Sequence, residues 1–375
     1  MLKIVLFDPM AQADPGLAED PVATLSVEPG ITLVRLAGEA DLEAWQAFVD
    51  SRPDAGSLHH AGWFRVLNTA FDVEPCYLLA LDAAGAVRGI LPAYYSHSLL
   101  AGRHLSSLEG GVLAEAQPVA DAIVAEARAL RDRRRAQYLQ LRGGLVDDAA
   151  AVAVATVHTI ISTDRPSEAL WAAVKKKTRW AIRQTEKVGV TVEQDTGLGQ
   201  LHDFYDVYAA RMRDLGTPVV GWRAFDAMRT YLGVSRLRLY LVKYDNRPIG
   251  GMLCVVNGNR WTDLYAAAQV TEATEFANYL LYWHVIRDAS ALGVASLNLG
   301  RSTPDSGVHM FKRKWGGADV KIPYHFYPAS DARPRDMGLQ EMKLHKGLTQ
   351  RVWSRLPLPI ANRFGPLVRR QLPFI

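Results

Sequence analysis

The residues best placed to do chemistry lie in the segment 296–317, where a short apolar strand runs into a polar loop and a basic turn of helix. Alternating leucines predict a strand over Ser296–Leu299 that ends at Gly300. Arg301 and Ser302 follow this strand end, where open α/β sheets usually place their ligands. The segment therefore predicts a cationic edge beside a pocket, which suits an anionic substrate or a developing oxyanion. The alternative for Arg301 is a structural arginine that ties the loop to nearby carbonyls.

The helical turn after the loop supplies further cations. On a helical wheel Val308, Phe311 and Trp315 share one side, which predicts that they anchor the turn to a core. Lys312 and Lys314 lie on opposite edges of this apolar stripe. A fixed ammonium beside a reacting carbonyl would stabilise tetrahedral charge by roughly 3 kcal/mol. The alternative for Lys312 is a lysine whose stem covers Phe311 while its amine reaches solvent.

Acyl transfer to an amine also needs a base, because the attacking amine must lose a proton. Strand alternation over Arg260–Ala268 places Trp261, Asp263 and Tyr265 on one face. Beside aromatic surface Asp263 would have a raised pKa and act as the base, and Tyr265 would donate a proton to the leaving group. A structural aspartate in a hydrogen-bond network is the more common alternative. The substrate's own phosphate or carboxylate is another candidate base.

A basic helix offers a second set of binding residues. Lys175, Arg179 and Arg183 are spaced four apart and line one helix face, with Lys176 and Trp180 beside them. Such a face would hold phosphates, as on a nucleotide-sugar or an RNA acceptor stem. A solvated helix face is the alternative. A protein that binds RNA through this helix is a further hypothesis for the function.

These segments resemble a known family. The run 298–317, NLGRSTPDSGVHMFKRKWGG, resembles the Gly-Arg-Ser…Phe-Lys-x-x-Trp-Gly signature of FemAB-like proteins, an acyltransferase group built from GNAT-type folds. Some members are found near exosortase and exopolysaccharide genes. The runs 57–71 and 74–111 resemble the family's first domain, and 174–190 resembles the basic helix that opens its second. The resemblance implies that Phe311 and Lys312 line the acyl-transfer site, which makes Lys312 the first candidate cation.

The chain also departs from its relatives. They commonly carry an acidic residue where this chain has Asn298, so no catalytic role is carried over to that position. GNAT acetyltransferases hold coenzyme A on a glycine-rich turn at a helix N-terminus, but the equivalent segment 268–279 has no glycine. We therefore expect acyl-CoA bound in another way, or aminoacyl-tRNA, as the co-substrate. No Cys/His cluster has zinc spacing, so no metal is expected.

The resemblance implies an N-acyltransferase that moves an acyl or aminoacyl group onto an amine of a cell-envelope sugar or peptide precursor, in peptidoglycan or exopolysaccharide synthesis. Its partners would be an anionic envelope precursor and, in the aminoacyl case, tRNA. The alternative is a non-catalytic binding or assembly protein on a degenerate GNAT scaffold in polysaccharide biosynthesis. The sequence does not indicate an oligomeric state.

An internal repeat sets the predicted architecture. The segments from Tyr77 and from Leu239 each read as an apolar strand, a turn and a second strand led by glycine, which predicts two β-hairpins with Gly89 and Gly250 in equivalent places. With the resemblance, this predicts an α/β (α+β) protein of two tandem GNAT-like domains, each a mixed central sheet flanked by helices. The predicted boundaries are 1–162, 163–330 and a basic tail, 331–375.

Helices are predicted around Val119–Arg134, Val146–Val157 and Glu275–Ala289, and a further one opens near Asp164 or Ser167 and ends at Gly189.

The charge of the chain is concentrated at its end. The formal net charge is +4, and the chain from Met337 onward has seven Lys and Arg residues against one acidic residue. Its apolar and arginine residues alternate, which predicts either a tail packed across the two domains or a peripheral contact with the inner membrane face. Two lone cysteines in separate apolar runs and the lack of a long apolar segment predict a cytoplasmic protein without disulfides.

Overall fold

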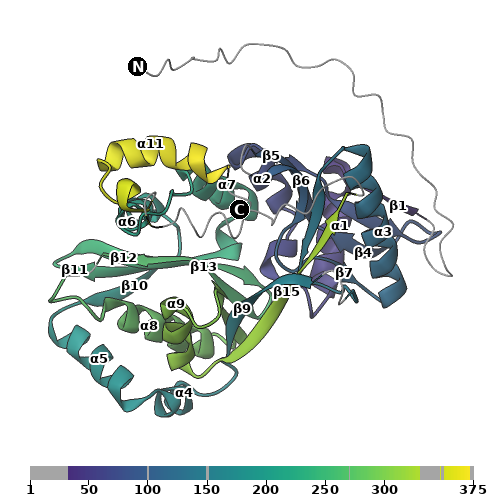
Figure 1. The fold of residues 1–375 in the computed structure, drawn as a ribbon. Coiled ribbons are helices and arrows are strands. Elements are labelled where there is room, and N and C mark those ends of the chain that lie inside the picture. Colours follow the sequence, from purple (N-terminus) through teal and green to yellow (C-terminus); the bar gives the residue numbers. More distant parts are fainter. Residues whose placement is uncertain are drawn as a thin grey trace, which may run out of the picture.

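The computed structural model describes residues 33–98, 101–148, 152–269, 271–329, 347 and 350–371. Two lobes stand side by side and share one mixed sheet (Figure 1). Across this sheet the strands follow the order β10 (Thr191–Asp195), β11 (Leu237–Tyr244), β12 (Arg247–Asn257), β13 (Arg260–Ala268), β14 (Ser296–Ser302), β9 (Val152–Ser162), β15 (Ala318–Pro328), β8 (Tyr138–Arg142), β6 (Gly102–Ser107), β5 (Ala93–Ser98) and β2 (Glu74–Pro75).

A second, four-stranded sheet belongs to the first lobe. Its strands follow the order β1 (Leu33–Leu36), β3 (Leu78–Leu81), β4 (Val87–Leu91) and β7 (Leu113–Ala114).

Each lobe contains one parallel strand pair joined by a helix. β6 runs parallel to β8, and α3 (Gln117–Arg133) connects them. β13 runs parallel to β14 in the same way, and α8 (Ala277–Ala291) connects them. Parallel neighbours need such a crossover, because the chain must return to the same end of the sheet. The repeat expected from the hairpins therefore extends to a whole β-α-β unit in each lobe.

The two predicted hairpins are confirmed as β3–β4 and β11–β12. Their leading glycines are needed because other chain segments lie against them. A Cβ on Gly89 would be 2.7 Å from Val119 Cγ1 of α3, and a Cβ on Gly250 would be 2.6 Å from the Cβ of Ala268. Glycine is thus the residue that lets each hairpin pack closely.

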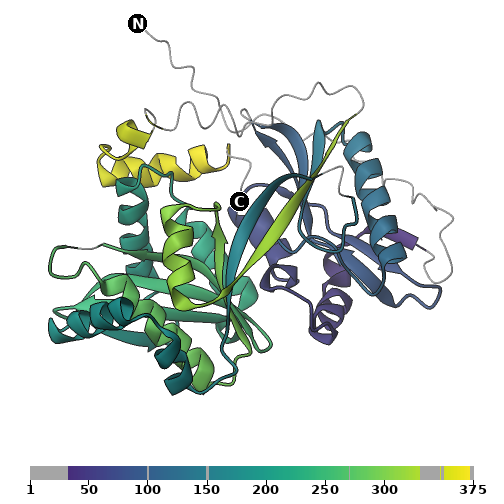
Figure 2. The same ribbon diagram turned by 60° about the horizontal axis from the view of Figure 1, so that its bottom comes forward.

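Two strands join the lobes in the middle of the shared sheet. β15 pairs antiparallel with β9 along most of its length and with β8 near its end, while β9 also pairs with β14 of the second lobe. Figure 2 shows β9 and β15 running together between the lobes. The strand that precedes the predicted boundary at residue 162 therefore contributes to the second lobe as well.

Helices cover both faces of the second lobe. In Figure 1, α6, α7 and α11 lie over one face of β11–β13, and α4, α5, α8 and α9 lie over the other. The remaining helical bounds are α1 (Leu42–Ser51), α2 (Trp63–Ala70), α4 (Ser167–Ala173), α5 (Lys176–Lys187), α6 (Leu201–Asp214), α7 (Trp222–Leu232), α9 (Gly307–Lys312) and α11 (Leu358–Arg369), with 3-10 turns η1 (Glu39–Asp41), η2 (Ser57–His59), η4 (Val234–Arg236) and η5 (Arg313–Trp315).

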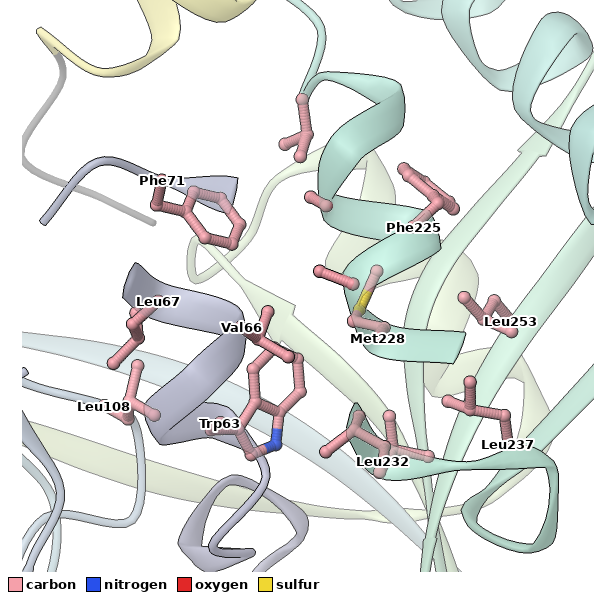
Figure 3. Close-up of a cluster of buried hydrophobic side chains, with 14 of the residues drawn as sticks. Trp63, Val66, Leu67, Phe71, Leu108, Phe225, Met228, Leu232, Leu237 and Leu253 are labelled. Atoms are coloured by element: carbon pink, nitrogen blue, oxygen red, sulfur yellow. The ribbon is translucent and has the colours of Figure 1, made fainter. Parts of the chain in front are cut away.

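An apolar contact between α2 and α7 fixes one lobe on the other. Trp63, Val66 and Leu67 of α2 are buried in the same cluster as Met228 and Leu232 of α7, and Figure 3 shows the two sets facing each other. Since this contact has the composition of a domain core, we infer that the lobes form one unit rather than two bodies free to hinge.

Two helix predictions are wrong, one in the type of element and one in its continuity. The run predicted as a helix over Val146–Val157 enters β9 at Val152. Short apolar runs are ambiguous, and here the many β-branched residues favour the strand. The helix predicted to end at Gly189 is interrupted, because Val174 and Lys175 adopt extended backbone between α4 and α5. The helices predicted at Val119–Arg134 and Glu275–Ala289 correspond to α3 and α8.

Cys76 and Cys254 are both buried and free, as expected. Within the described ranges, no helix has the length and hydrophobicity needed to cross a membrane.

Candidate functional site

The site forms where β13 and β14 stop pairing. Their parallel ladder covers only the pairs from Arg260 with Ser296 to Thr262 with Asn298. Beyond it, Gly300 has a φ of +73°, and a Cβ there would lie 2.7 Å from the carbonyl oxygen of Asp263. Both the left-handed backbone and this close approach require glycine. The strand end consequently turns its carbonyl groups toward the helical turn that follows.

Lys312 fills the space beside this strand end. Its Nζ donates hydrogen bonds to the carbonyl oxygens of Gly300 (3.0 Å) and Arg301 (3.1 Å), and only 5% of the residue is exposed. Burial lowers the pKa of Lys312, while the nearby Asp263 acts in the opposite direction. The predicted alternative, in which the amine reaches solvent, does not hold.

The helical wheel was right that Phe311 and Trp315 anchor the turn, but wrong in placing Val308 inside and Lys312 at the edge. Val308 is 58% exposed, whereas His309, Lys312 and Trp315 are buried. The reason lies in the strand: the carbonyls of β14 supply hydrogen-bond partners for an ammonium, so a lysine occupies the inner face of the turn. Phe311 packs at its edge, with its ring 5.0 Å from that of Tyr282.

Asp263 is buried near Lys312. Its Oδ2 accepts a 2.9 Å hydrogen bond from the hydroxyl of Tyr282 on α8. Burial raises the pKa of Asp263 to about 6, although Lys312 and Tyr282 both oppose the rise. A carboxyl group with this pKa can accept a proton near neutral pH and release it again, as a general base must.

Tyr265 does not share a face with Asp263, so the predicted alternation is wrong here. The ladder between β12 and β13 shifts register between Leu253 and Cys254, which pairs Cys254 with Asp263 but Leu253 with Tyr265. This bulge reverses the side-chain phase. Tyr265 therefore packs on the opposite face of the sheet, with its ring 4.9 Å from that of Phe225 on α7.

Arg301 belongs to a polar cluster that joins the two lobes. Its Nη1 donates to the hydroxyl of Tyr324 (3.2 Å) and lies 3.6 Å from Oε1 of Glu109. The Tyr324 hydroxyl donates to the same Glu109 oxygen at 2.7 Å, and His158 Nε2 lies 3.2 Å from its other oxygen. We call Glu109, His158, Arg301 and Tyr324 the junction cluster. Ser302 is buried beside it, and its hydroxyl has no hydrogen-bond partner within the described part of the chain.

The charge of the junction cluster is set by Glu109. Burial opposes ionisation of this carboxyl group, but the close contact with His158, the charge of Arg301 and the hydrogen bond from Tyr324 outweigh burial and lower its pKa to about 2. The same surroundings raise the pKa of Arg301 despite its burial. Glu109 and Arg301 are therefore both charged at neutral pH.

Asn298 connects this cluster to the strand end. Its amide nitrogen lies 2.9 Å from Nδ1 of His158, and its carbonyl oxygen accepts from the backbone N–H of Gly300 at 2.9 Å. If Nδ1 accepts from the amide, the proton of His158 sits on Nε2 and faces Glu109. An asparagine can provide both a donor and an acceptor here, which a carboxylate cannot.

Glu109, His158 and Tyr324 were not among the predicted site residues. Glu109 lies just past the end of β6, much as Arg301 lies at the end of β14. Its position as a polar residue after a strand could therefore have identified Glu109 from the sequence. His158 and Tyr324 lie inside strands and carry no comparable signal. They are brought together only because β9 and β15 pair between the two lobes.

An open cavity of about 450 Å³ lies between α5, α8 and the turn α9–η5. Its lining is cationic and aromatic, and consists of Lys175, Lys177, Thr178, Trp180, Ala181, Phe276, Tyr279, Met310, Arg313 and Lys314. Lys314 Nζ donates to the hydroxyl of Tyr279 at 2.7 Å. We call this the basic cavity. Such a lining suits a ligand that combines anionic groups with a planar or apolar part.

The other predicted residues of the basic helix lie outside this cavity. Arg179 donates to the carbonyl oxygens of Trp171 and Ala172 (3.2 and 3.1 Å), which end α4. Arg183 stacks over the ring of Trp171 at 5.8 Å. These two arginines hold α4 on α5, and Lys176 is exposed beside them. The structure brings Lys312 together with Asp263 and Arg301, but not with Arg179 or Arg183.

The described residues contain no group of three or more His, Cys, Asp or Glu side chains that could bind a metal ion.

The comparisons with known proteins agree with this fold. Residues 172–313 match the family described as an acetyltransferase (GNAT) domain, a range that contains both Asp263 and Lys312. No curated protein matches the sequence. Residues 172–313, which make up less than half of the chain, are therefore similar to a GNAT acetyltransferase domain.

Solved structures extend the likeness over most of the chain. FemX is 13% identical, with a TM-score of 0.59 over 82% of this chain and 98% of that one. The C-terminal domain (DUF2156) of an Agrobacterium fabrum protein assigned as a lysylphosphatidylglycerol synthetase is 13% identical, with a TM-score of 0.56 over 82% and 96%. A conserved protein of unknown function from Bacteroides thetaiotaomicron is 9% identical, with a TM-score of 0.52 over 78% and 98%. The fold is thus of the FemAB-like GNAT type, which confirms the predicted α/β class; at these identities the likeness concerns the fold alone.

Proposed function

We propose that this protein is an N-acyltransferase that moves an acyl or aminoacyl group onto an amine of a cell-envelope sugar or peptide precursor. The observation that carries the proposal is the buried ammonium of Lys312. It is held by the carbonyls of Gly300 and Arg301 where β13 and β14 separate, and it interacts electrostatically with Asp263. The GNAT domain match and the FemX-like fold support the reaction class.

In the proposed reaction the amine of the acceptor attacks the carbonyl carbon of the donor, so a C–N bond forms. The carbonyl oxygen becomes an oxyanion, which the ammonium of Lys312 would stabilise. Asp263 would take the proton that the amine loses. The C–S bond of a thioester or the C–O bond of an ester then breaks, and this proton passes to the leaving sulfur or oxygen. Tyr265 has no step in this scheme, because it lies across the sheet.

The basic cavity would bind the anionic part of the donor. Lys175, Lys177, Arg313 and Lys314 provide positive charge, and Trp180 provides an exposed aromatic face. Acyl-CoA and the 3′ end of an aminoacyl-tRNA share the required chemistry, since each combines phosphate groups with an adenine ring. The acceptor would approach Arg301 and Ser302 at the end of β14. An envelope precursor as acceptor rests on the resemblance of residues 298–317 to FemAB-like proteins.

The experiment compares Lys312→Ala with Lys314→Ala, two lysines on the same turn. Loss of an oxyanion donor should lower kcat about 100-fold in Lys312→Ala, whereas Lys314→Ala should mainly raise KM for the donor. Acetyl-CoA and aminoacyl-tRNA are supplied separately as donors, with amino-sugar and peptide precursors as acceptors. Equal effects of the two substitutions on kcat, or no effect of either, would remove the special role of Lys312.

A non-catalytic binding protein is the second candidate. Its support is that two carbonyl groups already engage the Lys312 amine and that segment 268–279 lacks the glycine-rich turn of acetyl-CoA binders. Thermal-shift measurements separate the two functions. An enzyme should be stabilised by acyl-CoA or charged tRNA, whereas a binding protein should respond only to lipid or polysaccharide.

A further inference from the structure

The described part of the basic tail is fixed on the body of the protein. α11 packs against α6, and Gly365 fits so closely that a Cβ would lie 2.8 Å from Val219 Cγ1. Just past the helix, the carbonyl oxygen of Gln371 accepts a 2.7 Å hydrogen bond from Ser98 of the first lobe. The described part of the tail therefore packs across both lobes, which was one of the two arrangements that the sequence left open.

The packing leaves the large apolar residues of α11 outside. Ala361 and Gly365 face inward, and Ala361 is only 2% exposed, whereas Ile360 is 43%, Phe364 49% and Leu367 47% exposed. These three residues recur at helical spacing and form one stripe, which we call the α11 stripe. A helix that served only to cover the core would bury its large side chains and expose its small ones. The α11 stripe therefore has the arrangement of a contact surface.

The charge around the α11 stripe indicates the kind of partner. From residue 342 onward the chain has seven Lys and Arg residues and no Asp or Glu. Among them Arg351, Arg355 and Arg363 are exposed, and Arg363 lies on α11 next to Phe364. A symmetric contact with a second copy would bring two such cationic tails together, which electrostatic repulsion disfavours. An apolar stripe with Arg363 beside it, on a tail whose other exposed cations precede the helix, instead matches an interface with acyl chains below and phosphate groups around them.

We propose that α11 docks the protein on an anionic phospholipid bilayer, lying in the plane of the interface with Ile360, Phe364 and Leu367 inserted. The arginines would contact lipid phosphates, because an anionic membrane surface attracts basic residues close to it. This inference does not depend on the proposed acyl transfer, because it concerns a different face of the second lobe from Lys312.

The test is co-sedimentation of the full chain with vesicles of phosphatidylglycerol and phosphatidylcholine in equal parts, and with vesicles of phosphatidylcholine alone. The wild type should bind the anionic vesicles, and added salt should weaken binding. The double substitution Phe364→Ser with Leu367→Ser should lower the partition coefficient roughly tenfold, because it removes the inserted apolar surface. Arg355→Gln with Arg363→Gln should lower binding to anionic vesicles and reduce its salt dependence.

The matched control removes two exposed apolar residues elsewhere, Val234→Ser with Leu292→Ser. This variant and Lys312→Ala should bind vesicles like the wild type. Vesicle binding therefore tests membrane docking even if the acyl-transfer proposal is wrong. Absence of wild-type binding, or equal binding by the α11 and control variants, would overturn the proposal. So would light scattering that shows a dimer which the α11 substitutions dissociate, without binding to vesicles.

Discussion

The hydroxyl of Tyr324 donates a 2.7 Å hydrogen bond to Glu109, and this contact links the ends of two equivalent structural units. Glu109 follows β6 in the first lobe, and Tyr324 also accepts from Arg301 at the end of β14 in the second. The parallel strand pair of each lobe thus ends at the same cluster. Because Arg301 also provides a carbonyl group to Lys312, a change at Glu109 can reach the candidate catalytic residue through one backbone segment.

We expect Glu109→Gln to lower the free energy of unfolding by about 1–3 kcal/mol, since it removes the buried negative charge that lies beside Arg301. The pKa of Glu109 is lowered to about 2, so its contribution is complete at neutral pH and is lost as the pH falls toward that value. Urea denaturation of both proteins measures the difference. The control is Glu115→Gln, which breaks the exposed pair with Arg88 and should change stability by less than about 1 kcal/mol. Equal losses would show that the junction cluster contributes nothing beyond a surface pair.

Gly300→Ala should be more damaging than Gly316→Ala, although both glycines have positive φ, +73° and +76°. At Gly316 no atom lies within 4 Å of the added Cβ, so only the backbone strain of about 1 kcal/mol is expected. At Gly300 the Cβ also meets the Asp263 carbonyl oxygen at 2.7 Å, which should add about 1–3 kcal/mol and displace the acceptors of Lys312. Thermal unfolding and kcat are measured for both variants, and similar values would contradict the close packing at Gly300.

The pH dependence should report on Asp263, because burial raises its pKa to about 6. If Asp263 is the base, kcat/KM should fall below about pH 6, where the carboxyl group is protonated. Asp263→Asn should abolish most activity. If the residual kcat/KM of this variant still falls below about pH 6, Asp263 is not the group that causes the decrease.

The raised pKa of Asp263 also predicts how stability depends on pH. Activity should fall as the pH decreases, whereas stability should fall as the pH increases. Because the folded-state pKa lies above the unfolded value, the folded protein binds the proton more tightly, and this stabilisation is lost as the pH rises through about 6. The free energy of unfolding of Asp263→Asn, measured relative to that of the wild type, should therefore increase by about 2 kcal/mol as the pH rises from 4 to 7. Parallel stability curves for the two proteins would show that Asp263 titrates normally.

Neighbouring lysines test the basic cavity. Both Lys176 and Lys177 are exposed, but only Lys177 lines the cavity. Lys177→Ala should weaken binding of coenzyme A or of tRNA about fivefold, as expected for one lost charge near a phosphate in partly solvated surroundings. Lys176→Ala should leave the affinity nearly unchanged. Titration calorimetry at two salt concentrations measures both, and a larger effect of Lys176→Ala would place the ligand outside the cavity.

The sequence by itself determined the local elements that position the site. Turn residues between alternating apolar runs correctly predicted both hairpins. Alternating leucines correctly predicted the strand that ends in the site. These patterns are local, because strand and helix periodicity depend on residues only a few positions apart. The choice of Lys312 as a distinctive residue came from the motif that contains it.

The tertiary structure alone decided which side chains meet. A single bulge in β13 moved Tyr265 away from Asp263, and no alternation rule detects a bulge that depends on the partner strand. Lys312 turned inward because β14 presents two carbonyl groups. Glu109 and Tyr324 meet across 215 positions of sequence. Gly365 is the inward residue of α11 at Val219, because a Cβ there would lie 2.8 Å from Val219 Cγ1. Such relationships arise from contacts between distant segments, whose energies are absent from any local pattern.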